Sequence, residues 1–356
     1  MRLSVLAVAV LLAGCALNER TSEPLAQATQ TITPRVGGTW QDNLRNAALL
    51  SAMVYGASPD HELRELGGGE GLRALMPGLS VARRLVLFAH QGLPAEYFAP
   101  RLWIMPWVRH PEVYVIGNPA DQSLNIVFVG SNDLSDWYQN AKASVYEDDG
   151  EAGDPFIPSG HAGFRRGVTN LIDSGFFSDE LPELCRAWGI RPGADGRVPV
   201  FVSGHSLGAA IAQLSLPVLD GWHHTGERAV DGAFVIERGE GLFSVRGVHL
   251  IAPPYAIASD EYLDEDLPPE RWRRDAAVYE WMVRTYGGIT WNVIHDADVV
   301  CSVYDFRKVH EVSMKHFGRL VRIDGNGQAR IEETSWRNQR PHDYWSYWRS
   351  LRTLPR

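Results

Sequence analysis

A pentapeptide of the form G-x-S-x-G, at residues 204–208, constrains the fold more than any other part of the chain. It follows an apolar, β-branched run at 198–202 and opens a stretch of small and apolar residues at 209–214. A serine in this context is typical of a nucleophile elbow, in which flanking glycines let a strand and a helix pass closely while the hydroxyl is raised on a strained turn. We therefore predict that Ser206 is a nucleophile and that the neighbouring His205 is a packed residue of the turn.

The first fifteen residues are typical of a secretion signal rather than of a folded element. Residues 1–14 carry one arginine and then an apolar stretch that is too short to span a bilayer. The ending Leu-Ala-Gly-Cys resembles a bacterial lipoprotein signal, whose cleavage leaves the cysteine as an acylated first residue. This resemblance implies that Cys15 is a lipid anchor, because two or more acyl chains hold a protein stably on a membrane. A plain signal peptide is the alternative. Ala16 after the cysteine implies the outer membrane of a bacterium, facing the periplasm or the cell surface.

Beyond the signal, composition separates a tether from one large domain. Residues 15–39 are polar, rich in Thr, Ser, Gln and Pro, and lack a periodic apolar pattern, so we expect a flexible, lipid-anchored tether. Residues 40–356 have a length that suits a single α/β enzyme domain with surface insertions. A net charge of −9 without a basic cluster argues against nucleic acid as a partner. Cys185 and Cys301 are compatible with a disulfide in an oxidising compartment, and the sequence leaves that pairing open.

Strand and helix patterns alternate along the chain, which predicts an α/β fold with a mostly parallel central sheet and helices on both faces. Apolar spacing predicts helices at 43–56, 81–90, 162–172 and 271–285. Strands are predicted at 113–116, 125–129, 200–203, 247–252 and 290–295. A turn at 324–327 joins two strand patterns and predicts a C-terminal antiparallel hairpin. Two polar or proline-rich segments, 219–243 and 253–269, are expected to be surface excursions near the carboxyl edge of the sheet.

An elbow serine needs a base and an acid, which follow it in the order acid and then histidine on this fold. Just past the strand predicted at 290–295 stand two aspartates, Asp296 and Asp298. Here the chain resembles the class three (fungal-type) lipases of the α/β-hydrolase fold, whose segment has the form V-x-H-x-x-D-x-V-P. That register falls on Asp298, with Cys301 at the proline position. The resemblance implies that Asp298 orients the base and leaves Asp296 as the alternative.

The base must come from the histidines that follow or neighbour the acid, which are His295, His310, His316 and His342. The family ends in an H-x-x-x-x-Y segment that supplies its catalytic histidine, and residues 341–348 resemble that segment. The resemblance therefore implies that His342 is the base. His316 lies in a segment similar to a structural H-x-G strand of the family and is the alternative.

The oxyanion formed during ester cleavage needs preorganised donors. The backbone N–H of Leu207, at the start of the helix, is one by geometry. Residues 128–131 resemble the family's F-R-G-[TS], which implies a second donor at Ser131, although Val129 replaces the arginine.

An amphipathic helix is predicted directly after this segment. Its apolar residues recur at helical spacing, at Leu134, Trp137, Tyr138, Ala141 and Val145. The resemblance implies a lid over the pocket, and packing on the core is an equal alternative. Residues 161–164 match an H-x-G-F element that is expected to start a structural helix.

These segments span residues 125–347 in the family's order and imply a membrane-tethered serine hydrolase of lipase type. It would cleave carboxylic esters of lipids through an acyl-enzyme, with Ser206, His342 and Asp298 as its triad. No cofactor is implied, and the histidines lack zinc-type spacing, so no metal is expected. The expected partners are a lipid or ester substrate and the membrane that holds Cys15. Two alternatives stay open: the same site as a phospholipase or acyltransferase, or a lipoprotein that binds lipid without turnover.

Overall fold

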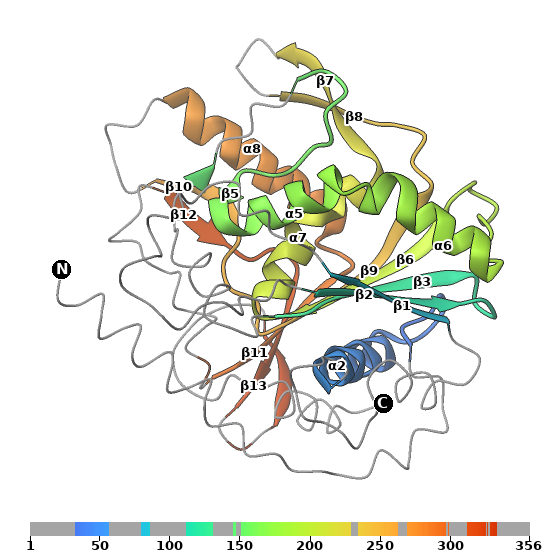
Figure 1. Ribbon diagram of the computed structural model, residues 1–356. Coiled ribbons are helices and arrows are strands. Elements are labelled where there is room, and N and C mark those ends of the chain that lie inside the picture. Colours follow the sequence, from blue (N-terminus) through green and yellow to red (C-terminus); the bar gives the residue numbers. More distant parts are fainter. Residues whose placement is uncertain are drawn as a thin grey trace, which may run out of the picture.

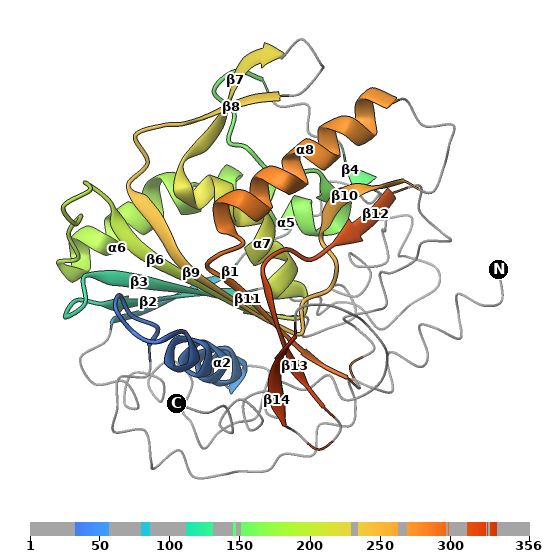
Figure 2. The ribbon, with the colours of Figure 1, turned by 180° about the vertical axis from the view of Figure 1, so that it is seen from behind.

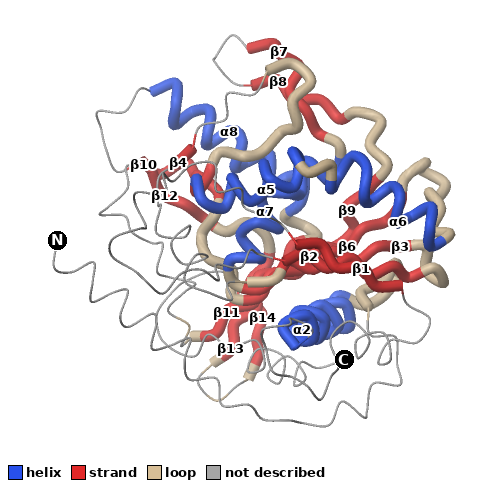
Figure 3. The backbone as a smooth tube through the Cα atoms, in the orientation of Figure 1, coloured by secondary structure: helices blue, strands red, loops and turns tan. Residues whose placement is uncertain are grey.

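The computed structural model describes residues 33–56, 80–85, 112–130, 145–146, 151–228, 234–262, 269–296, 298, 312–324, 326 and 328–332. Their frame is an eight-stranded sheet between two layers of helices (Figures 1 and 3). From edge to edge the strands are β1 (Ser80–Leu85), β2 (Glu112–Asn118), β3 (Ser123–Phe128), β6 (Val198–His205), β9 (Phe243–Ile251), β11 (Thr290–His295), β13 (Arg319–Ile323) and β14 (Ala329–Glu332).

The five central strands β3, β6, β9, β11 and β13 run parallel to one another. At one edge β1 and β2 pair antiparallel, and at the other β14 pairs antiparallel with β13. The mostly parallel sheet and its C-terminal hairpin are therefore confirmed. With a G-x-S-x-G turn at the end of the central strand β6, the architecture is that of an α/β-hydrolase.

The helix predicted at 81–90 is wrong for residues 81–85, which belong to the edge strand β1. All six residues of β1 pair with β2, from Ser80 opposite Gly117 to Leu85 opposite Glu112. The spacing of the apolar residues fits a helix turn, but pairing with a strand far along the chain decides the outcome. Residues 86–90 lie outside the described residues.

Helices cover both faces of the sheet, as predicted (Figures 1 and 2). On one face lies α2 (Trp40–Gly56), and on the other lie α5 (Ala162–Asp173), α6 (Leu181–Trp188), α7 (Leu207–Asp220) and α8 (Pro269–Tyr286), with a π-helix, η2 (Phe176–Glu180), between α5 and α6. The helices predicted at 43–56, 162–172 and 271–285 are thus present as α2, α5 and α8. Because both faces are covered, every residue of β3 is buried.

A second sheet, in the order β12-β10-β5-β4, lies against α8 through β10. Its strands are β4 (Val145–Tyr146), β5 (Gly160–His161), β10 (Ile257–Tyr262) and β12 (Val312–Lys315). Since β10 follows the end of β9, segment 253–269 leaves the main sheet at its carboxyl edge, the edge where the parallel strands end. Val145, the last position of the predicted amphipathic helix, belongs to β4. The rest of that prediction, residues 134–144, lies outside the described residues.

The described part of segment 219–243 lies at the amino edge of the sheet, opposite the carboxyl edge that was predicted. Helix α7 has 14 residues and carries the chain about 21 Å back from the elbow, towards the amino edge of the sheet. There β7 (Trp222–Arg228) and β8 (Phe234–Arg238) form an antiparallel pair. The segment then rejoins the sheet where the Val198 N–H donates to the Leu242 carbonyl at 2.7 Å. The length of the helix, which polarity does not reveal, decides this placement.

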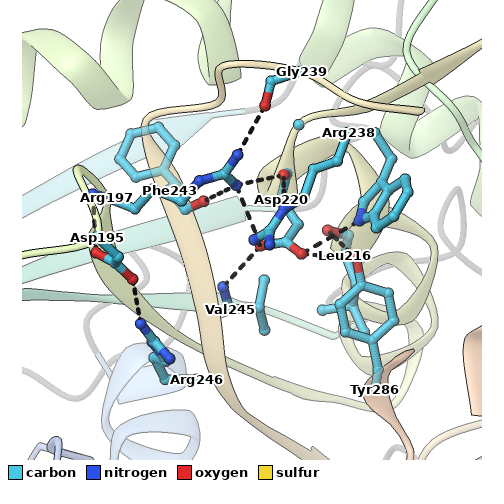
Figure 4. Close-up of polar contacts among 12 residues, drawn as sticks. Asp195, Arg197, Leu216, Asp220, Arg238, Gly239, Phe243, Val245, Arg246 and Tyr286 are labelled. Carbon is cyan, nitrogen blue, oxygen red and sulfur yellow. Dashed lines mark hydrogen bonds and ion pairs between the residues drawn. The ribbon is translucent and has the colours of Figure 1, made fainter. Parts of the chain in front are cut away.

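Helix α7 is fixed at its far end by Asp220, its last residue (Figure 4). The buried Asp220 carboxylate forms an ion pair with the Arg238 guanidinium of β8 at 2.5 Å, and the Asp220 carbonyl accepts a hydrogen bond from Arg197 at 3.0 Å. At the end of α8, the Tyr286 hydroxyl lies 3.5 Å from the same carboxylate. Burial, together with the Asp220 charge, holds the pKa of Tyr286 well above its ordinary value. The helix that begins at the elbow is therefore tied to β8, to the start of β6 and to α8.

The domain packs from Thr33 onward, so its boundary lies before the predicted one at residue 40. Thr33 is fully buried, and its hydroxyl accepts a hydrogen bond from the Asn118 amide at 3.2 Å. Further along, the Arg35 N–H donates to Asn43 Oδ1 at 3.0 Å and the Val36 N–H to Asp121 at 3.1 Å. These bonds satisfy backbone groups that a flexible tether would leave to water. Residues 33–38 therefore belong to the domain.

Cys185 is a free thiol on α6, buried in the larger core. Cys185 therefore does not form the disulfide with Cys301 that the sequence leaves open. Cys301 itself lies outside the described residues. Among the described helices, none combines the length and the apolar character needed to cross a membrane.

Candidate active site

The backbone of Ser206 has the strained conformation of a nucleophile elbow. Its φ of 55° and ψ of −127° lie in a backbone region that residues other than glycine rarely adopt. Such a conformation costs about 1–3 kcal/mol of folding free energy. Hydrogen bonds on both sides hold it there: the Ser206 N–H donates to the Ile251 carbonyl at 3.0 Å, and the Ser206 carbonyl accepts from the Ala209 N–H at 2.9 Å. The predicted strand–turn–helix context of the motif is therefore confirmed.

Two glycines of the motif leave no room for a side chain. A Cβ on Gly204 would lie 2.7 Å from the carbonyl carbon and oxygen of Gly208. A Cβ on Gly208 would lie 2.3 Å from the Phe128 carbonyl oxygen and 2.6 Å from that of Val129. These are contacts with backbone, which cannot move aside as a flexible side chain can. The strand, the helix and the end of β3 therefore approach at distances that only glycine permits.

The first turn of α7 lies beside the end of β3, where the oxyanion donors were predicted. Leu207 is the first residue of α7, so its N–H is among the four that have no acceptor within the helix. Through Gly208, this turn contacts Phe128 and Val129, the first two residues of the segment 128–131 that is predicted to supply the second donor. Val129 is fully buried, which suits the apolar residue that replaces the family's arginine. Ser131 lies outside the described residues, so its oxyanion role stays a prediction.

The two candidate acids have different surroundings at the end of β11. Asp296 forms an ion pair with the Arg322 guanidinium of β13, and its N–H donates to the Ile323 carbonyl at 2.8 Å. Asp298 is 2% exposed, and its N–H donates to the His295 carbonyl at 2.9 Å. This bond closes a four-residue turn that carries Asp298 just past the strand. Asp296 is thus paired with β13, Asp298 is the more buried of the two, and the assignment of Asp298 as the acid stays a prediction.

Ser206 and Asp298 lie at the same edge of the sheet, with one strand between theirs. β9 pairs with β6 on one side and with β11 on the other, so the ends of the three strands adjoin. Ile251, the last residue of β9, lies opposite both His205 and Val293, and its carbonyl holds the Ser206 N–H. The carboxyl edge of a parallel sheet is where such folds place their sites.

The candidate bases are only partly described. His342 and His310 lie outside the described residues, so the assignment of His342 as the base stays a prediction. His316 is partly exposed as a whole residue, but both of its ring nitrogens are buried. Its ring stacks on Tyr255 at 4.4 Å, and its carbonyl accepts a hydrogen bond from the Tyr279 hydroxyl at 2.7 Å. Burial lowers the pKa of His316 to about 3, so the ring is neutral at pH 7. These contacts are those of a packing residue.

Two other histidines singled out by the sequence have the packed roles predicted for them. His205 is the last residue of β6 and is 3% exposed. His161 caps α5: its Nδ1 accepts a hydrogen bond from the Gly163 N–H at 3.2 Å, and its ring stacks on Phe164 at 4.1 Å. Residues 161–164 therefore start a structural helix, as expected.

Sequence reasoning missed Arg322, the partner of Asp296. It stands in β13 between the buried Val321 and Ile323, and a charged residue is most often exposed. Its side chain is in fact only 11% exposed. Only the register between β11 and β13 could have revealed the pair, and that register is not encoded locally. Among the described residues, no three His, Cys, Asp or Glu side chains lie close enough together to hold a metal ion.

Fungal lipases are among the solved structures that resemble this chain. Lipase II from Rhizopus niveus matches with a TM-score of 0.49 and 14% identity, over 85% of this chain and 88% of its own. The lipase from Rhizopus microsporus var. chinensis matches with a TM-score of 0.48 and 13% identity, over 85% and 81%. A triacylglycerol lipase from Penicillium expansum matches with a TM-score of 0.48 and 13% identity, over 85% and 91%. No protein-family model and no curated protein matches the chain. At these identities and TM-scores, the likeness carries no inference about activity or substrate.

Proposed function

We propose that this chain is a serine hydrolase that cleaves carboxylic esters of lipids. The observation that carries the proposal is the backbone of Ser206, whose positive φ is held by hydrogen bonds at the junction of β6 and α7. A folded chain keeps such a conformation on a side-chain-bearing residue only where the surroundings impose it, and these sites are commonly catalytic. On an α/β-hydrolase sheet, this turn presents a hydroxyl to the pocket at the carboxyl edge.

The reaction proceeds through an acyl-enzyme. The Ser206 hydroxyl attacks the ester carbonyl carbon while His342 takes its proton, and Asp298 holds the imidazole in place. The N–H groups of Leu207 and Ser131 bind the oxyanion. His342 then returns the proton to the leaving alcohol, and water releases the fatty acid by the same route. The burial of Asp298 and the engagement of Asp296 by Arg322 favour Asp298 as the acid.

The first test is the loss of Ser206. Ser206→Ala is expected to lower kcat/KM for p-nitrophenyl esters by about 10³-fold or more, because no other group replaces the nucleophile. Ser215→Ala is the matched control: this serine is also buried, within α7, and its hydroxyl donates to the Ile211 carbonyl at 2.8 Å. A fluorophosphonate probe should label Ser206 in peptide maps. Wild-type hydrolysis by Ser206→Ala would refute the proposal, and failure to label would favour a lipid-binding protein without turnover.

The substrate we propose is an ester of the triacylglycerol type. Comparing triacylglycerol, phospholipid and short-chain esters in one assay tests this, with Ser206→Ala as the blank in each arm. A preference for phospholipid would identify a phospholipase. Transfer of the acyl group to an added alcohol in place of water would identify an acyltransferase on the same site.

We also propose that Cys15 anchors the protein to a bacterial membrane, with the outer membrane as its location. The support is the Leu-Ala-Gly-Cys ending of the apolar N-terminal stretch. Labelled palmitate should be incorporated by the full-length chain and not by Cys15→Ser, and the variant should move from the membrane to the soluble fraction. Unlabelled, soluble wild-type protein would refute the anchor and leave the hydrolase proposal intact.

A further inference from the structure

An ion pair at the carboxyl edge of the sheet lies two residues from the proposed acid. It joins Asp296, just past β11, to Arg322 of β13. We propose that this pair positions the turn that carries Asp298, so that Arg322 and Asp296 set the placement of the acid without touching the substrate. The inference rests on the proposed function, because it concerns the geometry of the same triad.

The register of the two strands brings the partners together. Ile294 lies opposite Arg322 and His295 opposite Ile323. Side chains alternate along a strand, so Asp296 is on the same face of the sheet as Ile294 and Arg322. The Asp296 N–H also donates to the Ile323 carbonyl at 2.8 Å, which extends the ladder by one residue. Asp296 is thus held to β13 by both its backbone and its side chain.

The turn connects this fixed point to the acid. Asp298 is separated from Asp296 by a single residue, and its N–H donates to the His295 carbonyl at 2.9 Å. A rotation or shift of Asp296 therefore moves Asp298 directly. The side chain of Arg322 is 11% exposed and that of Asp296 28%, so the pair is better shielded than a surface salt bridge. Removing either charge leaves the other partly buried without its partner, which loosens the turn.

The acid acts only through its placement against the base. A displacement of about 1 Å within a catalytic constellation can lower turnover by about 10²-fold, while substrate binding elsewhere is unchanged. A loosened Asp298 also stabilises the protonated imidazole less, so the acid limb of the kcat–pH profile moves to lower pH. The loss of a purely structural ion pair would lower only the fraction of folded enzyme, and it would leave the kcat–pH profile of that folded fraction unchanged.

The experiment compares Asp296→Asn, Arg322→Gln and the double variant on a p-nitrophenyl ester. Each single variant should lower kcat about tenfold with KM within about twofold of wild type, and should shift the acid limb to lower pH. The kcat of the double variant should be no lower than that of the more affected single variant, because both substitutions remove the same ion pair. The conservative variants Asp296→Glu and Arg322→Lys keep the charges and should recover part of kcat. They also provide a readout if the neutral variants do not fold.

Asp220→Asn is the control for a general loss of stability. Like Asp296, Asp220 is an aspartate paired with an arginine, but it lies at the far end of α7 from the elbow. This variant should unfold more easily and keep the wild-type kcat and pH profile in its folded fraction.

Three results would overturn the inference, and each differs from a failure of the proposed function. Wild-type kcat and pH profile in Asp296→Asn would show that the pair does not position the acid. Equal losses in the conservative and the neutral variants, without a change in the pH profile, would show a packing effect. An Asp296→Asn variant as inactive as Ser206→Ala, beside an active Asp298→Asn, would make Asp296 the acid itself. The proposed function fails separately, if Ser206→Ala remains active.

Discussion

Gly208 lies so close to Phe128 that a Cβ on the glycine would be 2.3 Å from the Phe128 carbonyl oxygen. The contact joins the first turn of α7 to the end of β3. These two elements lead to the two predicted oxyanion donors. The separation of these elements is therefore set by the absence of a side chain at one position.

Gly208→Ala is expected to destabilise the fold by about 1–3 kcal/mol, because the backbone of β3 must move to admit the methyl group. It should also lower kcat for ester hydrolysis, since the Leu207 N–H moves with the helix start. Urea denaturation and steady-state kinetics measure the two effects. Gly288→Ala is the control, because a Cβ at Gly288 meets nothing within 4 Å. Unchanged stability in Gly208→Ala would contradict the close approach.

Asp220→Asn is expected to lower the free energy of unfolding by about 3 kcal/mol, because it leaves the Arg238 guanidinium without its anion beside a buried site. Tryptophan fluorescence in urea gives the value. Asp195→Asn is the matched control: Asp195 pairs with Arg246 at 2.5 Å, but the two side chains are 43% and 48% exposed. That variant should cost less than about 1 kcal/mol. Similar losses in the two variants would mean that the burial of Asp220 contributes little.

His249 makes the stability of the fold depend on pH. Burial in β9 lowers its pKa to about 3, whereas a histidine in the unfolded chain titrates near 6.5. Between about pH 6.5 and pH 3, the unfolded state therefore binds a proton that the folded state does not. The folded state has its full stability above this window and loses it as the pH falls, by up to about 1.4 kcal/mol per pH unit.

His249→Phe should remove the part of the slope that His249 contributes, while His316, whose ring nitrogens are buried, still contributes a similar part. Urea denaturation at several pH values from 8 to 4 measures it. Above pH 7 the difference between variant and wild type should be constant. Parallel curves across the whole range would show that His249 does not titrate as its burial requires.

Cys185 should resist alkylation in the native protein. Burial raises the pKa of its thiol to about 11, so the reactive thiolate is scarce at pH 8. Iodoacetamide should leave the peptide that contains Cys185 unmodified until concentrated guanidinium chloride unfolds the chain, as mass spectrometry can show. A disulfide-linked Cys185 peptide in a non-reducing digest, or rapid native labelling, would contradict the position of Cys185 in the core.

The predictions that hold are those whose cause is local in the sequence. The elbow follows from a serine between two glycines after an apolar run, and the C-terminal hairpin from the turn at 324–327. The errors arise where distant segments decide. Ser80–Leu85 becomes a strand because β2 offers a partner, and the described part of segment 219–243 lies at the amino edge because α7 has carried the chain there.

The candidate site divides in the same way. Ser206 and Leu207 could be placed from the motif alone, since backbone geometry fixes both. The choice between Asp296 and Asp298 needed the resemblance to the class three lipases, because both aspartates stand on the same short loop. Arg322 could not be found from the sequence at all. Arg322 and Asp296 are 26 residues apart along the chain, and they become neighbours only when β11 and β13 pair in register.

The positive φ of Ser206 places the thermal stability of the fold and its catalytic turnover in conflict at one residue. Glycine adopts that backbone region without steric cost, so Ser206→Gly should melt at a higher temperature than the wild type while losing its hydrolysis. A library selected only for survival of heating would drift towards glycine at residue 206. One selected for ester cleavage would keep the hydroxyl.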